Sequence, residues 1–144
     1  MSFKKVLIAI DGEPVAVHAA ETGVDLALAL GAEVALVHVI DASLLNPDDI
    51  GLSPNELISA AKLDAKRLVA AIRQRLPPQS PVLEFFQVGT PSNEIVKAAQ
   101  EWPADLIVIG SHRRGAMQRA LLGSVAETVM RHAPCPVVVV RAKE

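Results

Sequence analysis

Short runs of consecutive apolar residues, each followed by a turn, constrain this chain most. The clearest runs are Val6 to Ile10, Leu106 to Ile109 and Val137 to Val140, and Val34 to Ile40 is apolar except at His38. A strand that is apolar at every position is buried on both faces, as in a parallel sheet covered by helices. Val82 to Val88 is a fifth candidate strand. We therefore predict an α/β protein with a five-stranded parallel sheet.

Helical stretches with apolar residues every three or four positions separate these strands. They are Val15 to Leu30, a long stretch from Ser53 to about Leu76, Ser92 to Glu101, and a last helix that begins at Ser124. Gly31 follows the first stretch in the place of a C-terminal glycine. Strands that alternate with helices imply right-handed crossovers, so the sheet should carry helices on both faces. With 144 residues and no internal repeat, residues 1–144 should form one domain.

Composition and charge exclude several classes of protein. The net charge of −2 is evenly distributed, which argues against a nucleic-acid surface, because such a surface needs clustered Lys and Arg. No apolar run reaches the roughly 18 residues that cross a bilayer, and the N-terminal residues do not form a cleavable signal. The single cysteine, Cys135, cannot form an internal disulfide and is favoured as a small core residue over a nucleophile. We expect a cytoplasmic protein without a membrane segment.

The segment from Gly110 to Glu127 carries the most chemistry. In an open parallel sheet, ligands bind outside the carboxyl ends of the strands, where the strand order reverses. Gly110 permits a tight turn after the fourth strand, and Gly123 lets backbone approach a ligand. Ser124 and Glu127 fit a capping box that begins the last helix, whose first-turn N–H groups would bind phosphate. Many capped helices after a glycine share this form, so the spacing alone leaves a purely structural interpretation open.

Several blocks of the chain occur in a characteristic order. They are Asp11-Gly12, His38-Val39-Ile40, Gly89-Thr90-Pro91 with Glu94-Ile95, Ala104 to His112, Leu121 to Ala126, and Arg131 to Val137. Together they resemble the universal stress protein family over the whole chain. That family's phosphate-binding pattern is glycine, two residues, glycine, nine residues, then glycine with serine or threonine. The resemblance implies a Rossmann-like domain with strand order 3-2-1-4-5 that binds ATP or a related adenine nucleotide, with or without Mg²⁺.

The resemblance also implies which residues bind the nucleotide. They would be Ala9, Ile10, Asp11, Val39, Ile109, Gly110, Arg113, Gly123, Ser124 and Val125. Asp11 and its strand neighbours would line the adenosine side, Val39 would meet adenine through its backbone, and the glycine-rich residues would hold ribose and phosphates. We assign no catalytic or metal-binding residue, because no nucleophile, base and orienting group occur together and no histidine pair has metal-site spacing.

A homodimer is expected through the fifth strand. With the implied strand order, Val137 to Val140 lies at the sheet edge with unpaired backbone groups along one side, which invites aggregation. Antiparallel pairing of two copies about a two-fold axis would satisfy both edges. Many universal stress proteins dimerise through this strand, so the resemblance implies the same assembly.

Two positions depart from the family pattern. Arg113 replaces the second glycine, so its guanidinium would either contact phosphate oxygens or obstruct the approach of a ligand. Glu13 replaces a common serine, and its carboxylate opposes a triphosphate unless it points away or Mg²⁺ intervenes. From the resemblance over the whole chain, we expect an ATP-binding regulatory protein of the stress response. Two alternatives are a slow ATP hydrolase or phosphoryl-transfer enzyme using the same pocket, and a dimeric scaffold that binds no nucleotide.

Overall fold

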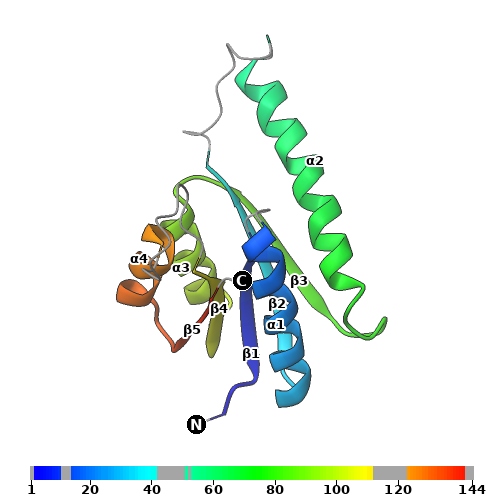
Figure 1. Ribbon diagram of the computed structural model, residues 1–144, viewed down its shortest axis with the longest axis vertical. Coiled ribbons are helices and arrows are strands. Elements are labelled where there is room, and N and C mark those ends of the chain that lie inside the picture. The colour runs from blue at the N-terminus through cyan, green and yellow to red at the C-terminus, as the bar shows by residue number, and fades with distance from the viewer. Residues whose placement is uncertain (1, 11–13, 42–50, 52, 112–122, 142–144) are drawn as a thin grey trace.

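The structure is a computed structural model that describes residues 2–10, 14–41, 51, 53–111 and 123–141, with residues 14–16 described by backbone alone. The elements in chain order are β1 (Lys5–Ile10), α1 (Pro14–Leu30), β2 (Glu33–Ile40), α2 (Pro54–Arg73), β3 (Val82–Val88), α3 (Pro91–Glu101), β4 (Leu106–Gly110), α4 (Ser124–His132) and β5 (Val137–Val140). The strands form one five-stranded sheet in the order β3-β2-β1-β4-β5 (Figure 1). All neighbouring strands pair in parallel, so the predicted fold class and strand order are confirmed.

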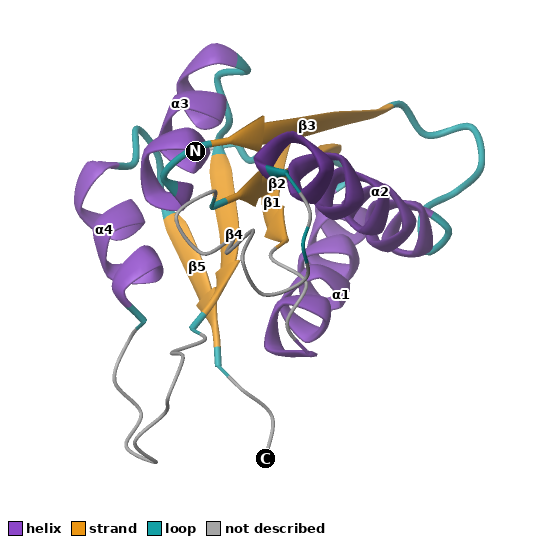
Figure 2. Ribbon diagram, turned by 90° about the horizontal axis from the view of Figure 1, so that it is seen from above, coloured by secondary structure: helices purple, strands orange, loops and turns teal. Residues whose placement is uncertain are grey.

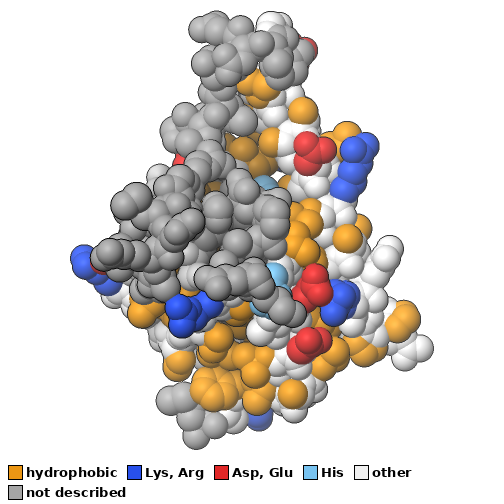
Figure 3. Space-filling model, in the orientation of Figure 1, with side chains coloured by type: hydrophobic (Ala, Val, Ile, Leu, Met, Phe, Trp, Pro, Cys, Tyr) orange, Lys and Arg blue, Asp and Glu red, His pale blue; other side chains and the backbone are white. Residues whose placement is uncertain are grey.

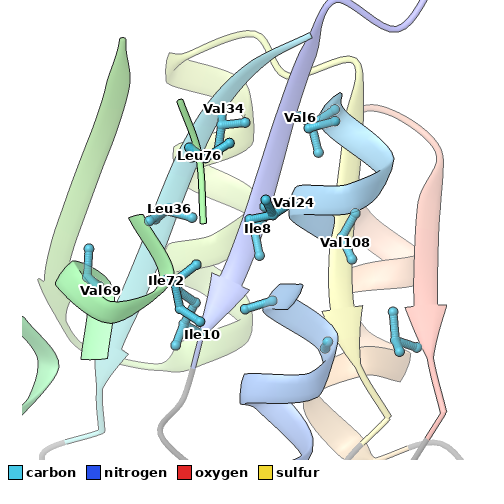
Figure 4. Close-up of a cluster of buried hydrophobic side chains, with 14 of the residues drawn as sticks. Val6, Ile8, Ile10, Val24, Val34, Leu36, Val69, Ile72, Leu76 and Val108 are labelled. Carbon is cyan, nitrogen blue, oxygen red and sulfur yellow. The ribbon is translucent and has the colours of Figure 1, made fainter. Parts of the chain in front are cut away.

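Two layers of helices enclose the sheet. Figure 2 shows α1 and α2 on one side and α3 and α4 on the other. In β1, Val6, Ile8 and Ile10 pack toward α1 and α2 (Figure 4), whereas Leu7 and Ala9 pack toward α3 and α4. All five side chains are buried, which explains why this strand is apolar at every position after Lys5.

The end of α1 and the start of α2 follow local sequence signals, whereas the end of α2 does not. Gly31 ends α1 with a φ of 64°, the left-handed conformation that a C-terminal glycine adopts readily. At the start of α2, the Ser53 hydroxyl accepts from the Glu56 N–H and the Glu56 carboxylate accepts from the Ser53 N–H, each over 3.2 Å. The predicted end of α2 near Leu76 was too late. The helix ends at Arg73, because tighter bonds such as that from the Leu76 N–H to the Arg73 carbonyl replace the helical pattern.

The surface of the described residues exposes several large apolar side chains. They are Leu28, Leu30, Leu63, Leu83, Val88 and Met130. In the space-filling view, apolar side chains reach the surface at several separate places on the visible face (Figure 3). No helix in the described ranges is long and apolar enough to cross a membrane.

Candidate functional site

The candidate site lies where the strand order reverses, between β1 and β4. β1 pairs with β2 as far as Ile10↔His38, but the register between β1 and β4 ends at Ile8↔Val108. Both strands nevertheless continue, β1 to Ile10 and β4 to Gly110. The ends of these two strands therefore extend past their shared ladder at the carboxyl edge, the position where ligands bind in open α/β sheets, and we refer to this place as the crevice.

The backbone directions at this crevice follow from three hydrogen bonds and from strand geometry. In a parallel ladder, successive residues turn their N–H and C=O groups alternately to the two neighbouring strands. The Gly89 N–H donates to the Ile40 carbonyl, so Ile40 faces β3 and the carbonyl of Val39 faces the β1 side. The Ser111 N–H donates to the Val140 carbonyl, so Ser111 faces β5 and Gly110 faces the β1 side.

Both groups point to positions past the last paired residues of β1. The carbonyl of Val39 lies beyond the Ile10↔His38 pair, and the N–H of Gly110 lies beyond the Ile8↔Val108 pair. The crevice thus presents one backbone acceptor from β2 and one backbone donor from β4. A ligand with both hydrogen-bond donors and acceptors could bind across it.

Four of the expected site residues lie on one face of the sheet. Ala9 and Ile109 are buried in the core cluster between the sheet and the α3 and α4 helices, and Val39 and Val125 pack against the same cluster. Ile10 is buried on the opposite face, toward α1 and α2. We call these four residues the apolar wall on the α3 and α4 side of the carboxyl edge; Ala9 and Ile109 are buried within it, and Val39 and Val125 are half-buried. Ile10 contributes only its backbone on that side.

The start of α4 differs from the prediction. Ser124 does not cap the helix, because the N-cap residue is Gly123 and Ser124 is the first helical residue. The Glu127 carboxylate is 2.8 Å from Arg131, and no side chain hydrogen-bonds to the cap. The proposed capping box is therefore wrong. Among the described residues, no side chain accepts from the first-turn backbone N–H groups of α4, which is the condition for anion binding at a helix end.

The conformation of Gly123 explains part of its role. Its φ of −63° and ψ of 156° are angles that any residue adopts, so backbone strain does not require a glycine there. Gly123 is buried while Ser124 is exposed. A side chain at this position would therefore meet burial and not backbone strain.

Two expected site residues, Asp11 and Arg113, lie outside the described residues, as does Glu13. The contribution of the Arg113 guanidinium stays a prediction. Among the described residues, no group of three His, Cys, Asp or Glu side chains could hold a metal ion.

The resemblance already implied that Val39 meets adenine through its backbone, but the residues alone did not show where the ladders of β1 end. The Val39 carbonyl lies past the last pair of β1 with β2, and the Gly110 N–H lies past the last pair of β1 with β4. The sequence carried one related signal, the difference in strand length. The strand that ends at Ile40 is longer than the strand that ends at Ile10, so β2 extends past β1.

Cys135 lies at the other end of the sheet, just before β5. It is half-buried and packs against the cluster on the α4 side. Burial, and to a smaller extent the nearby Asp105 carboxylate, raises the pKa of the thiol. A raised pKa leaves less thiolate near neutral pH, which agrees with the prediction of a core residue over a nucleophile.

Comparison with known proteins agrees with this architecture. The chain matches the universal stress protein family over residues 2–141. Universal stress protein MJ0531 from Methanocaldococcus jannaschii is 35% identical over 144 residues, which cover 96% of this chain and 82% of that protein. This chain therefore belongs to the universal stress protein family.

Solved structures show the same fold. Protein MJ0577 matches with a TM-score of 0.85 and 32% identity, over 100% of this chain and 99% of that chain. A universal stress protein in complex with cAMP matches with a TM-score of 0.67 and 23% identity, over 99% of this chain and 100% of that chain. The Rossmann-like architecture is thus shared across the family.

Proposed function

We propose that this universal stress protein binds an adenine nucleotide, ATP with or without Mg²⁺, and acts in the cytoplasm as a ligand-responsive regulatory homodimer. The observation that carries the proposal is the early end of the ladder between β1 and β4, at Ile8↔Val108. This opening lies at the reversal of strand order, beside the start of α4. Folds of this kind bind nucleotides at that place.

The start of α4 supports phosphate binding. Gly123 provides no side chain at the cap, and the backbone N–H groups of the first turn carry the positive end of the helix dipole. Gly110, on the facing strand, turns its backbone toward the same opening. The phosphates would therefore be held by backbone donors, with Ser124 and Arg113 as additional ligands.

The apolar wall supports a base and a ribose. Ala9, Val39, Ile109 and Val125 lie on the face of the sheet that α4 covers. The Val39 carbonyl accepts hydrogen bonds, so it favours the exocyclic amino group of adenine over the carbonyl oxygen that guanine presents at the same position. The protein solved with cAMP shows that a member of this fold holds an adenine nucleotide, although at 23% identity its likeness speaks for the fold alone.

Calorimetry and thermal unfolding test the nucleotide proposal. A ligand that binds only the folded state adds about 2.7 kcal/mol of stability at a hundredfold excess over its Kd. ATP should raise Tm and GTP should raise it less. Millimolar ATP with Mg²⁺ that neither raises Tm nor gives heat of binding would contradict the proposal and favour the scaffold alternative.

The nucleotide content of the purified protein separates binding from turnover. Mass spectrometry after denaturation should detect co-purified ATP, whereas ADP alone would favour the hydrolase. Arg113→Ala then reports on the departure from the family pattern. Weaker ATP binding would show that the guanidinium contacts phosphate, and tighter binding would show that it obstructs.

The homodimer part of the proposal rests on β5, which is an edge strand. Pro136 and Val140 use their carbonyls toward β4, accepting from the N–H groups of Ile107 and Ser111. By alternation, Val137 and Val139 turn their N–H and C=O groups outward. Antiparallel pairing with a second copy would join these outward groups.

Light scattering tests the dimer. The expected mass is twice the 15.3 kDa of the chain, and a monomer at micromolar concentration would contradict the proposal. Val139→Pro removes an outward N–H without touching the bonds to β4, so it should give a folded monomer. Val138→Lys changes the α1 side of the strand, and Val139→Lys changes the α4 side. The substitution that disrupts the dimer identifies the pair of valines that faces the partner.

A further inference from the structure

The opposite edge of the sheet, formed by β3, is also unpaired in the described part of the chain. β3 pairs with β2 at all seven of its residues, from Val34↔Val82 to Ile40↔Val88, so its inner side is regular and has no bulge. β3 contains no proline and no lysine, the residues that commonly protect an edge strand. Leu83 is 49% exposed and Val88 is 39% exposed.

The outward backbone groups of β3 follow from its inner hydrogen bonds. The Gly89 N–H donates to the Ile40 carbonyl, so the odd-numbered residues of β3 face β2. The even-numbered residues, Val82, Glu84, Phe86 and Val88, therefore turn their N–H and C=O groups away from the sheet. This ladder can accept one extended segment over the full length of the strand.

Three basic residues form a stripe along α2, and the Arg73 end of this stripe reaches the β3 edge. Lys62, Lys66 and Arg73 lie within about 40° of one another around the helix axis. Arg73 shows which way this side of the helix faces, because its guanidinium is 3.2 Å from the Glu84 carboxylate of β3. Lys62 and Lys66 are exposed, and among the described residues neither has an ion-pair partner.

We propose that the β3 edge and this basic stripe form a docking site for an extended acidic segment of a partner protein, which adds as a further strand beside β3. The open ladder requires an extended backbone. Lysines on the α2 side require carboxylates at alternate positions of the segment, because alternate residues of a strand point to one face. This site is separate from the nucleotide crevice and does not depend on the proposed nucleotide function.

The test uses a fluorescent peptide of alternating Glu and Val residues and measures its binding by anisotropy. We expect it to bind, and the same peptide with Lys for Glu to bind more weakly. N-methylation of alternate backbone nitrogens, which blocks strand pairing, should abolish binding. Equal binding of the N-methylated peptide would overturn strand addition, and failure of the Glu–Val peptide to bind would overturn the site.

Matched charge reversals on α2 locate the contact. Lys66→Glu should weaken peptide binding roughly tenfold, because it places a carboxylate in the stripe. Arg67→Glu makes the same change in charge one residue away, where Arg67 pairs with Asp64 over 3.8 Å, and should have little effect. Equal effects of the two substitutions would show only a general response to net charge and would overturn the site.

Hydrogen exchange resolves the edge itself. Bound peptide should slow exchange of the outward N–H groups of Glu84 and Phe86 and leave those of Val137 and Val139 unchanged. Protection at β5 without protection at β3 would assign the peptide to the other edge and overturn the proposal.

Discussion

The two ends of the sheet are built in opposite ways. At the amino end, one oxygen of the Asp105 carboxylate accepts from the N–H groups of Lys4 and Lys5 over 2.9 and 3.0 Å. The Asp105 N–H returns a bond of 2.8 Å to the Lys5 carbonyl, and the Glu33 N–H donates to Lys4 over 2.8 Å. The starts of β1, β2 and β4 are thus tied together. At the carboxyl end, β1 and β4 leave their ladder.

The tied amino end and the unpaired carboxyl end suggest that different ends of the sheet serve stability and ligand binding. The central strands are held at their starts, so their ends can part around a ligand without loosening the core between them. The Lys5 ammonium also lies 5.6 Å from the centre of the Trp102 ring, which adds a contact between β1 and the end of α3. We expect substitutions at the amino end to change stability, and substitutions at the carboxyl end to change binding.

The largest expected effect is on binding, from Gly123→Val. The branched side chain would occupy the space in front of the first turn of α4, so we expect at least a hundredfold loss of ATP affinity, which corresponds to about 2.7 kcal/mol. The backbone angles of Gly123 suit any residue and the position is at a helix end outside the central strands, so we expect the variant to fold with some loss of stability from the buried side chain. Calorimetry measures the affinity and circular dichroism checks the fold.

The matched control is Thr90→Val at the start of α3. Thr90 is an N-cap residue whose side chain makes no cap hydrogen bond, so this change should leave stability and ATP affinity nearly unchanged. Normal ATP affinity in folded Gly123→Val would show that this glycine serves only the turn.

The next effect is on stability, from Asp105→Ala. The substitution leaves two backbone N–H groups without their charged acceptor, and the expected loss is about 2 kcal/mol, reduced by the exposure of Lys4. Asp105→Asn keeps an oxygen acceptor and should lose less. Urea unfolding measures both variants.

ATP affinity is the control for this prediction. It should stay within about twofold of the original protein, since Asp105 lies at the end of the sheet away from the crevice. A large loss of affinity in folded Asp105→Ala would contradict the separation between the two ends.

The sequence predicted the fold well because its signals were local. The central strands were apolar runs, broken only by His38 in β2. Gly31 ends α1 and Ser53 begins α2, as their chemistry dictates. The α4 cap was mispredicted because Ser124 and Glu127 have the spacing of a capping box, and spacing does not show which residue leaves the helical conformation first. The neighbouring placement of β1 and β4 was predicted from the family resemblance, but the residue at which their ladder ends was not, because it depends on where two distant segments stop pairing.

A smaller effect is expected at the boundary between the two ends, from Gly23→Ala in α1. An added Cβ would lie 2.9 Å from Ile8 Cγ1 and 3.3 Å from Val108 Cγ1, the two residues that form the last pair of the β1 and β4 ladder. Alanine favours the helix by about 1 kcal/mol, but overpacking costs about 1–3 kcal/mol. We expect a net loss of about 1 kcal/mol in urea unfolding.

A double substitution tests that cause. In an Ile8→Ala background the added methyl group has room, so Gly23→Ala should become neutral or stabilising. Increased stability of the single variant would instead show that Ile8 moves aside and that α1 does not fix the spacing of the two strands.

The smallest expected effect concerns pH at the amino end. Burial raises the pKa of the Cys135 thiol, with a smaller contribution from the Asp105 carboxylate. The folded protein then holds this proton more tightly than the unfolded chain, whose thiol has a pKa of about 8.5. Stability should therefore be complete below about pH 8.5 and decline as pH rises toward the folded pKa.

Cys135→Ala should remove that part of the decline in stability, and the rate of alkylation of Cys135 by iodoacetamide should follow the raised pKa. Asp105→Asn should lower it only partly, because burial is the larger cause. If Asp105→Asn returned the thiol to its ordinary pKa, charge would outweigh burial at this site, and the amino end would be less closely packed than its hydrogen bonds indicate.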